Sequence, residues 1–200
     1  MESILPSAAP ETAPPSHPPL RADARRNREK LIEAASAAFA EHGVETSLED
    51  IARKAGVGIG TLYRHFPTRE HLVEVIYRRE LEALAAAALE LAARHPSDIA
   101  LEEWMRRFVD YIATKRGMAG SLKILMDSNS SLFAEGAGRL KSAAGGLLTT
   151  AAQEGKIRDD IDTTDLLHAL SSIYSLPASP EWRDRSNRLI GLLMDGLRRK

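Results

Sequence analysis

The chain has 200 residues, 44% of them hydrophobic, which is enough for one or two small domains with a packed core. The formal net charge of −1 argues against a generally basic nucleic-acid-binding surface, and the absence of cysteine excludes disulfides, thiolate metal sites and cysteine nucleophiles. Because no apolar run has membrane-spanning length and the first residues lack a signal-peptide pattern, we predict a cytoplasmic protein without membrane contact.

Residues 1–22 are predicted to form a disordered tail, since six of the ten prolines lie within the first 20 residues and no periodic apolar stripe accompanies them. A basic segment overlaps its end and contains Arg21, Arg25, Arg26 and Arg28. These arginines either reach a DNA minor groove, as basic arms do beside other recognition helices, or belong to a solvated helix start. The first helix is expected from about Asp23 or Asn27 to His42, where Gly43 ends it.

Residues 47–66 have the pattern of a helix-turn-helix. Ser47 can accept a hydrogen bond from the Asp50 amide, which predicts a helix N-terminus at this point. Gly56 is placed to end this first short helix, and Pro67 ends a second one near Phe66. Two short helices with glycine in the turn are what a DNA-binding unit needs, although an ordinary helical hairpin has the same spacing.

The second short helix is expected to leave a polar face outward, with Ile59, Gly60, Thr61, Arg64 and His65. Gly60 lets the backbone approach a phosphate closely, and Arg64 can reach a base edge. Thr61, Tyr63 and His65 offer hydrogen-bond donors to phosphates. The predicted DNA-binding set is completed by Arg26, Thr46, Ser47, Gly58 and Arg69.

Beyond the helix-turn-helix, Thr68 is expected to cap a helix of about 28 residues that reaches His95 and can link this unit to a second domain. Further helices are predicted at about 97–115, 119–127, 130–154, 162–176 and 181–199, with Ser97 and Asp162 as caps. Because no segment has the two-residue period of a strand, we predict an all-α fold of about nine helices.

An aromatic stripe in the helix expected at 97–115 has two interpretations. Trp104, Phe108 and Tyr111 share one helical face, and core packing is the favoured explanation. The alternative is that they line a ligand cavity between helices, to which Met126 and His168 would contribute; such a cavity would suit a small, largely hydrophobic effector.

Other chemistry finds no support in the sequence. The six histidines show no metal-binding pair, and the loop containing Asp159 and Asp165 lacks the glycine and terminal glutamate of a calcium loop. No motif positions a nucleophile beside a base. We therefore predict no metal, no cofactor and no enzymatic activity.

Between Asn27 and about Ala83 the chain contains a series of short motifs: Ile32–Ala35, Phe39–Gly43, Thr46–Ser47, Asp50–Ala52, Ala55–Val57, Gly60–Tyr63, His65–Pro67 and Thr68–Leu72. In order and spacing, this segment resembles the N-terminal domain of TetR-family transcriptional regulators. Arg69 stands where the family more often has lysine, and it keeps the charge.

The resemblance implies a three-helix DNA-binding domain at 23–83 and a C-terminal ligand-binding and dimerisation domain at 84–200, after the tail at 1–22. It also implies a homodimer in which the last two helices of each subunit form a four-helix bundle, through Leu166, Leu170, Ile173, Leu189, Leu193 and Leu197. We predict a repressor that a small-molecule effector releases from a palindromic double-stranded DNA operator. The alternative from a different class is a protein-interaction adaptor that uses DNA as a platform.

Overall fold

The computed structural model describes residues 19–43, 46–177 and 179–199. Within these ranges the all-α prediction is confirmed, since they form nine α-helices, one short 3₁₀ helix and no strand beyond an isolated pairing of Ile157 with Arg198. The elements are α1 (Pro19–His42), α2 (Leu48–Lys54), α3 (Ile59–His65), α4 (Arg69–Arg94), α5 (Ser97–Gly117), α6 (Ala119–Ser128), α7 (Ser130–Gln153), α8 (Thr163–Ser171), η2 (Ser172–Ser175) and α9 (Trp182–Leu197).

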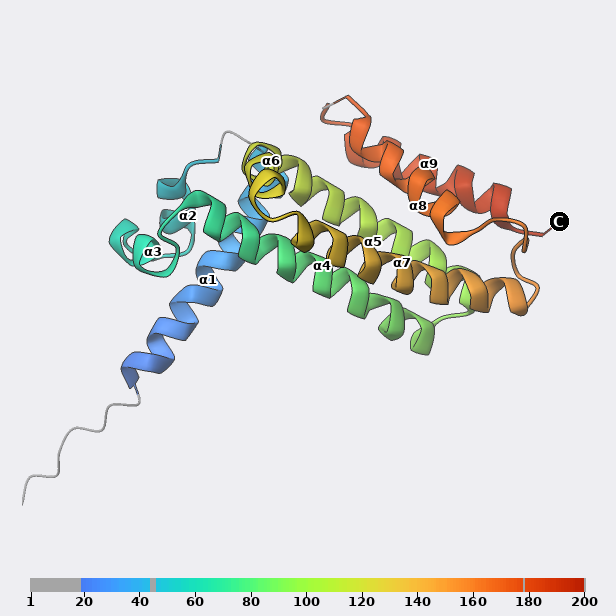
Figure 1. Cartoon of the computed structure of the whole chain (residues 1–200), viewed down its shortest axis with the longest axis horizontal. Coiled ribbons are helices and arrows are strands. Elements are labelled where there is room, and N and C mark those ends of the chain that lie inside the picture. The colour runs from blue at the N-terminus through green and yellow to red at the C-terminus, as the bar shows by residue number, and fades with distance from the viewer. Residues whose placement is uncertain (1–18, 44–45, 178, 200) are drawn as a thin grey trace, which may run out of the picture.

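The helices divide the molecule into two ends (Figure 1). Helices α1, α2 and α3 form a small unit at one end, and α4 leads from it along the length of the molecule. Helices α5 and α7 pack beside α4, while α8 and α9 form a further layer that packs on α7 and α5 respectively. The α8–α9 layer and α3 therefore lie in different parts of the molecule.

The helix-turn-helix has the local chemistry that the sequence predicts. The Ser47 hydroxyl accepts a hydrogen bond from the Asp50 amide at 3.0 Å and caps α2. Gly56, with a φ of 68°, provides the left-handed residue after α2. Helix α3 ends at His65, and both Leu62 and Phe66 are fully buried against the other helices of the unit.

Helix α1 begins earlier than the sequence suggests. Its first residue is Pro19, so residues 19–22, which we predicted to lie in the tail, are helical. Proline is tolerated in the first turn of a helix because its missing N–H would have no partner there. The rest of the predicted tail, residues 1–18, lies outside the described residues. Gly43, with a φ of 64°, follows α1 as predicted.

Two predictions about the C-terminal helices are wrong. Ser97 does not cap α5 but is its first residue, and its hydroxyl donates to the Glu154 carboxylate at 2.6 Å. Helix α8 is shorter than expected, because it ends at Ser171 and continues only as the 3₁₀ turn η2. The Asp162 cap is as predicted, with its carboxylate accepting from the Thr164 and Asp165 amides at 2.6 and 2.9 Å.

The end of α5 packs directly on the end of α1. A Cβ atom at Gly117 would overlap the carbonyl oxygen of Phe39, so only glycine permits this backbone contact. The Phe39 side chain is also held by Arg69, whose guanidinium lies 5.0 Å from the ring centroid. Through this joint, the position of the helix-turn-helix is tied to that of the C-terminal helices.

At the other end of the molecule, contacts of Arg198 with α5 and with Ile157 form a clip that holds the end of α9. Arg198, directly after α9, contacts Glu102 at 2.8 Å and Asp98 at 3.5 Å, both on α5. Its backbone pairs with Ile157, and the Arg158 amide donates to the Leu197 carbonyl at 2.8 Å. The loop after α7 and the end of α9 are therefore fastened together beside α5.

Candidate nucleic-acid interface

Helix α3 presents an open outer face at the end of the molecule (Figure 1). Tyr63 is 46% and Ile59 37% exposed, although both are large and partly apolar. Gly60 and Arg64 are also exposed, and the position of a Cβ atom at Gly60 has no atom within 4 Å. The backbone of α3 is thus accessible along the face that carries an arginine and a tyrosine hydroxyl.

The polar side chains of α3 differ in their exposure and contacts. The Arg64 Nε donates to the Gly60 carbonyl of its own helix at 3.2 Å, so the exposed guanidinium lies along α3. Thr61 and His65 are half-buried, and Gly58 is exposed at the N-terminus of the helix. The residues predicted to contact DNA on α3 are therefore together on one small surface.

The start of α2 carries a negative charge. A hydrogen bond with Ser47 and the charge of Arg53 hold the pKa of the Asp50 carboxyl below its usual value. Asp50 therefore stays ionised at the positive end of the helix dipole, where a negative charge is favourable. Ser47 itself is half-buried and is used as the cap of α2.

Two residues of the predicted DNA-binding set make hydrogen bonds within the protein. Thr46 is buried and its hydroxyl donates to the Ala38 carbonyl at 3.0 Å, which leaves it unable to reach a phosphate in this conformation. Arg69 is half-buried and donates to the Thr46 carbonyl at 2.7 Å. Both side chains therefore make contacts at the joint around Phe39.

The start of α1 offers a separate basic group. Arg26 is exposed and forms an ion pair with Asp23, three residues earlier on the same helix. Arg28, another arginine of the basic segment, lies with its guanidinium 5.4 Å from the Phe66 ring centroid. No spacing rule predicts this contact, because Phe66 comes from the end of α3 and meets α1 only in the folded unit.

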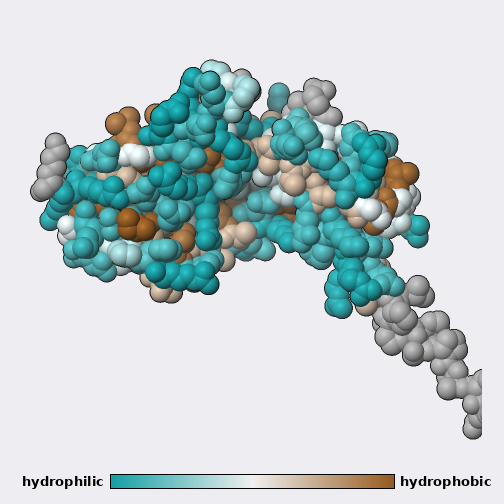
Figure 2. Space-filling model, turned by 180° about the vertical axis from the view of Figure 1, so that it is seen from behind, coloured by the Kyte–Doolittle hydropathy of each residue, from teal (hydrophilic) through white to brown (hydrophobic). Residues whose placement is uncertain are grey.

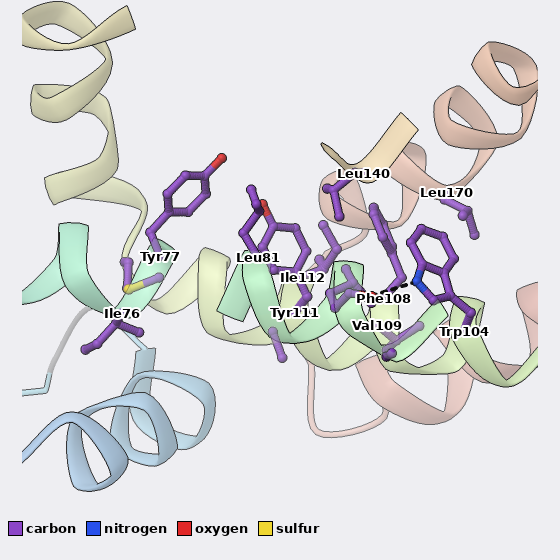
Figure 3. Close-up of a cluster of buried hydrophobic side chains, with 14 of the residues drawn as sticks. Ile76, Tyr77, Leu81, Trp104, Phe108, Val109, Tyr111, Ile112, Leu140 and Leu170 are labelled. Atoms are coloured by element: carbon purple, nitrogen blue, oxygen red, sulfur yellow. Dashed lines mark hydrogen bonds between the residues drawn. The ribbon is translucent and has the colours of Figure 1, made fainter. Parts of the chain in front are cut away.

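The predicted ligand residues are not brought together. Trp104, Phe108 and Tyr111 are buried, with ring centroids 5.9 and 5.7 Å apart, and the Trp104 indole donates to the Leu84 carbonyl at 2.9 Å (Figure 3). Met126 on α6 and His168 on α8 are instead exposed. This is the packing that the core interpretation of the aromatic stripe requires.

Burial shifts the pKa values of three polar side chains in and beside this core. Burial raises the pKa of Tyr111, an effect strengthened by the neighbouring Tyr77, and burial also raises the pKa of Tyr77. The Lys115 ammonium lies 5.9 Å from the ring centroids of both Tyr111 and Tyr174, and burial lowers its pKa. The centre of the C-terminal domain is therefore apolar with one cation at its edge.

Most residues of the predicted dimer contact are buried within the protomer. Leu166, Leu170, Ile173 and Leu197 are at most 6% exposed, so they cannot form an outer surface. The inner face of α9 is made by Trp182, Ser186, Ile190, Met194 and Leu197. Leu189 and Leu193 are half-buried, whereas Leu192, which the predicted contact did not include, is 68% exposed.

Apolar atoms reach the surface in small patches. Seen from the back, such patches emerge over both ends of a largely hydrophilic surface (Figure 2). Leu192 and Leu193 line an apolar crevice between α8 and α9 with a volume of about 280 Å³. A larger groove of about 760 Å³ runs between α4 and α7, beside the exposed Leu89. Exposed apolar groups on α9 are suited to contact another protein surface.

The fold and the open face of α3 define the class of this protein as a helical DNA-binding transcriptional regulator. Residues 31–76 match the family model described as bacterial regulatory proteins of the tetR family, and residues 95–199 match the C-terminal domain of SbtR-like transcriptional regulators. The chain belongs to the TetR family of bacterial transcriptional regulators. Regulators of this family bind DNA, and many form dimers and bind small ligands.

Solved structures agree with this membership. A TetR transcriptional regulator from Streptomyces coelicolor is 43% identical, with 86% of this chain and 98% of that chain covered and a TM-score of 0.75. A TetR regulatory protein from Mycobacterium vanbaalenii is 31% identical, with 90% and 100% covered and a TM-score of 0.69. An HTH-type transcriptional regulator from Staphylococcus aureus is 42% identical over 64 residues, which are 32% of this chain. The chain spans only about a third of the length of such curated relatives, at 35%.

In residues 19–43, 46–177 and 179–199, no three His, Asp or Glu side chains lie close enough together to hold a metal ion. In the same ranges, no helix has both the length and the hydropathy needed to cross a membrane.

Proposed function

We propose that the chain is a homodimeric repressor that binds a palindromic operator and is released from it by a small-molecule effector. The observation that carries this proposal is the outer face of α3, on which Gly60, Tyr63 and Arg64 are all exposed. A short helix with such a face fits the major groove of DNA, where it meets phosphates at the rim and base edges at the floor.

Within this interface the residues have different roles. Arg64 reads a base edge, because a guanidinium can donate two parallel hydrogen bonds to guanine. Tyr63, His65 and Thr61 donate to phosphates, and Gly60 lets the backbone approach one closely. Arg26 contributes a positive charge from the start of α1, where it must exchange its exposed ion pair with Asp23 for a phosphate.

The proposed dimer surface is the outer face of α9, defined by Leu189, Leu192 and Leu193. Leu192 and Leu193 lie three and four residues after Leu189, so the three side chains lie on neighbouring positions of one side of the helix. The buried residues of α8 and η2 support this layer from within the protomer. In such a dimer, the two copies of α3 would meet half-sites about 34–36 Å apart, so a small change in their separation would weaken binding.

Release requires an effector that binds the DNA-incompetent state more tightly, since equal affinity for both states shifts nothing. We place this effector in the C-terminal domain, beside Trp104, Phe108 and Tyr111. These rings contact one another in the present conformation, so an effector bound among them must part them. That opening is itself a difference between two states, of the kind that regulation requires.

We propose no catalytic activity and a cytoplasmic location. Regulators of this family are transcription factors, and the operator, rather than a substrate, is the partner to be sought. The second candidate function is an adaptor that recruits other proteins to DNA. Such an adaptor would also bind DNA through α3, but its binding sites need not overlap promoters.

Genomic footprinting tests the proposal. A repressor should protect a palindrome that overlaps a promoter, and deletion of its gene should raise transcription from that promoter. Fluorescence anisotropy with the recovered palindrome and with scrambled DNA then gives the specificity ratio, which is about 10³ or more for a specific regulator. Protection spread over DNA without promoters would favour the adaptor, and absence of any protection would contradict both.

A further inference from the structure

A cleft with a volume of about 590 Å³ lies where the two ends of the molecule meet. Its wall comes from the end of α1, the end of α5 and the start of α9, with Ala40, Ala113 and Trp182 among the lining residues. The connection that leads into α9 lies at the end of the α8–α9 layer nearest the DNA-binding unit (Figure 1). This cleft is separate from the aromatic core around Trp104 and Phe108.

Most charged side chains that line this cleft form ion pairs, and Arg116 is the exception. Arg183 pairs with Asp110, and Glu41 pairs with Lys54. Arg116 has no carboxylate within 4 Å among the residues that the structure describes. The cleft therefore has one wall with an uncompensated positive charge, at a side chain that is half-buried.

The hydrogen bonds of Arg116 leave one edge of its guanidinium open. It donates to the Tyr174 carbonyl at 3.1 Å and to the Leu176 carbonyl at 2.6 Å, and both bonds use Nη1. The edge formed by Nε and Nη2 has no hydrogen-bond partner in the described parts of the chain. Two parallel N–H groups on one guanidinium edge match the two oxygens of a carboxylate.

The neighbouring wall is apolar and flat. The Arg116 guanidinium lies 5.0 Å from the Trp182 ring centroid, and Pro180 and Ala113 line the cleft beside that ring. Trp182 is 7% exposed, and its indole N–H is buried without a hydrogen-bond partner among the described residues. An unpaired buried donor is costly, so an acceptor brought within its reach would be favourable.

We propose that this cleft binds a small monocarboxylate with a flat apolar body, held by the open edge of Arg116. The carboxylate would complete the arginine fork, and the apolar body would lie along Trp182, Pro180 and Ala113. Such a ligand would touch α1 of the DNA-binding unit and α9 of the dimer layer at once. Its effect on DNA rests on the proposed function, but its binding does not.

The test uses the full-length chain without DNA, so that failure of binding is distinguishable from failure of regulation. The probe is 2-naphthoate, with neutral 2-naphthamide as its matched control. The chain has two tryptophans, which give two indole N–H signals in a ¹⁵N-correlated NMR spectrum. Trp182→Phe assigns them, and the Trp104 signal serves as an internal reference because that indole is bonded to Leu84.

We expect 2-naphthoate to shift the Trp182 signal in a saturable manner and to leave the Trp104 signal in place. Arg116→Met should weaken this binding by about tenfold or more, since it keeps an unbranched stem but removes the guanidinium fork. Arg107→Met, on the same helix but paired with Glu90 outside the cleft, should bind as the unchanged chain does. 2-Naphthamide should bind at least tenfold more weakly than 2-naphthoate.

Arg116 also donates to the carbonyls of Tyr174 in η2 and of Leu176. The melting temperature of Arg116→Met is therefore measured to check that this variant folds. If Arg116→Met does not fold, the affinity of Ala40→Leu for 2-naphthoate is the deciding measurement. This variant narrows the cleft from the side of α1 and leaves Arg116 unchanged. Unchanged 2-naphthoate affinity in a folded Arg116→Met or Ala40→Leu variant would overturn the proposal. Equal affinity for the amide, or no shift of the Trp182 signal at millimolar 2-naphthoate, would also overturn it.

Discussion

Helices α3 and α9 are both amphipathic, and comparing their exposed faces separates two kinds of surface. Helix α3 buries Leu62 and exposes Tyr63 and Arg64, whereas α9 buries Ile190 and exposes Leu192. A polar face with an arginine suits a phosphate backbone, and an apolar stripe suits another protein surface. What a helix leaves outside therefore says more about its partner than the residues it buries.

The two ends can act on each other only if the joint between them is rigid, and Gly117 is its tightest point. In Gly117→Ala, the added methyl group would overlap the Phe39 carbonyl, so α5 and α1 must separate. We expect a loss of about 3 kcal/mol in the free energy of unfolding, measured by urea denaturation.

Gly120→Ala is the matched control for that experiment. A Cβ atom at Gly120 meets no atom within 4 Å, and the residue lies in α6. This variant should be as stable as the unchanged chain, or more stable by up to about 1 kcal/mol, because alanine favours helix. Equal stability of the Gly117 and Gly120 variants would show that the joint is not tight.

The apolar face of α9 is tested by Leu192→Glu. Because Leu192 is 68% exposed, the fold should tolerate the change, but a charge within an apolar contact would weaken the dimer by about 2–3 kcal/mol. Sedimentation velocity should then show a shift towards monomer. Leu89→Glu, at a residue of α4 that is 79% exposed, should leave the oligomeric state unchanged. A Leu192→Glu variant that remains a dimer would move the interface elsewhere.

The polar face of α3 is tested by comparing Arg64→Ala with Tyr63→Ala and His65→Ala. Loss of a base contact should reduce the discrimination between operator and random DNA by about 1–3 kcal/mol. Loss of a phosphate contact should weaken binding to both DNAs alike, because phosphates carry no sequence information. Anisotropy titrations measure both quantities, and an unchanged specificity ratio in Arg64→Ala would remove that residue from base reading.

The smallest effect is expected at Lys115, whose charge is half-buried at the edge of the core, whereas the charge of Arg64 on α3 is exposed. Burial holds the pKa of Lys115 below its usual value of 10.5, so the protonated form costs folding free energy at neutral pH. Unfolded chains bind the proton more tightly, and stability should rise as the pH increases from the lowered pKa towards 10.5.

Lys115→Met should therefore raise the melting temperature by a few degrees at pH 7, and this gain should shrink at higher pH. Calorimetry at both pH values measures it. Lys123→Met, at an exposed residue of α6, should change little. A lower melting temperature for Lys115→Met would mean that its contacts with Tyr111 and Tyr174 outweigh the cost of burial.

The helix-turn-helix was predictable because its signals act over a few residues. Ser47 caps the helix that follows it, and Gly56 and Pro67 end the helices beside them. The hydrogen bond of the Thr46 hydroxyl was not predictable for the opposite reason: its partner, the Ala38 carbonyl, is reached only after α1 and α2 have packed together. Local chemistry can be inferred from spacing, but contacts between elements cannot.

The C-terminal domain was less predictable because its helices carry apolar residues on more than one face. Helix α9 has Leu189 and Leu193 on one side and Ile190 and Met194 on another, and the stripe alone does not tell which is inside. The aromatic stripe around Phe108 raised a similar ambiguity, since a core and a ligand cavity need the same residue types. The unpaired edge of Arg116 had no sequence signal at all.

The clip formed by Arg198, Glu102 and Ile157 has a practical consequence for how the molecule can be immobilised. It lies at the end of the molecule remote from α3 (Figure 1). A biotin or dye attached beyond Arg199 would tether the chain by this end and leave the DNA-binding face accessible on a sensor surface. Shortening the chain before Arg198 would instead remove its ion pairs with α5 and loosen the anchor itself.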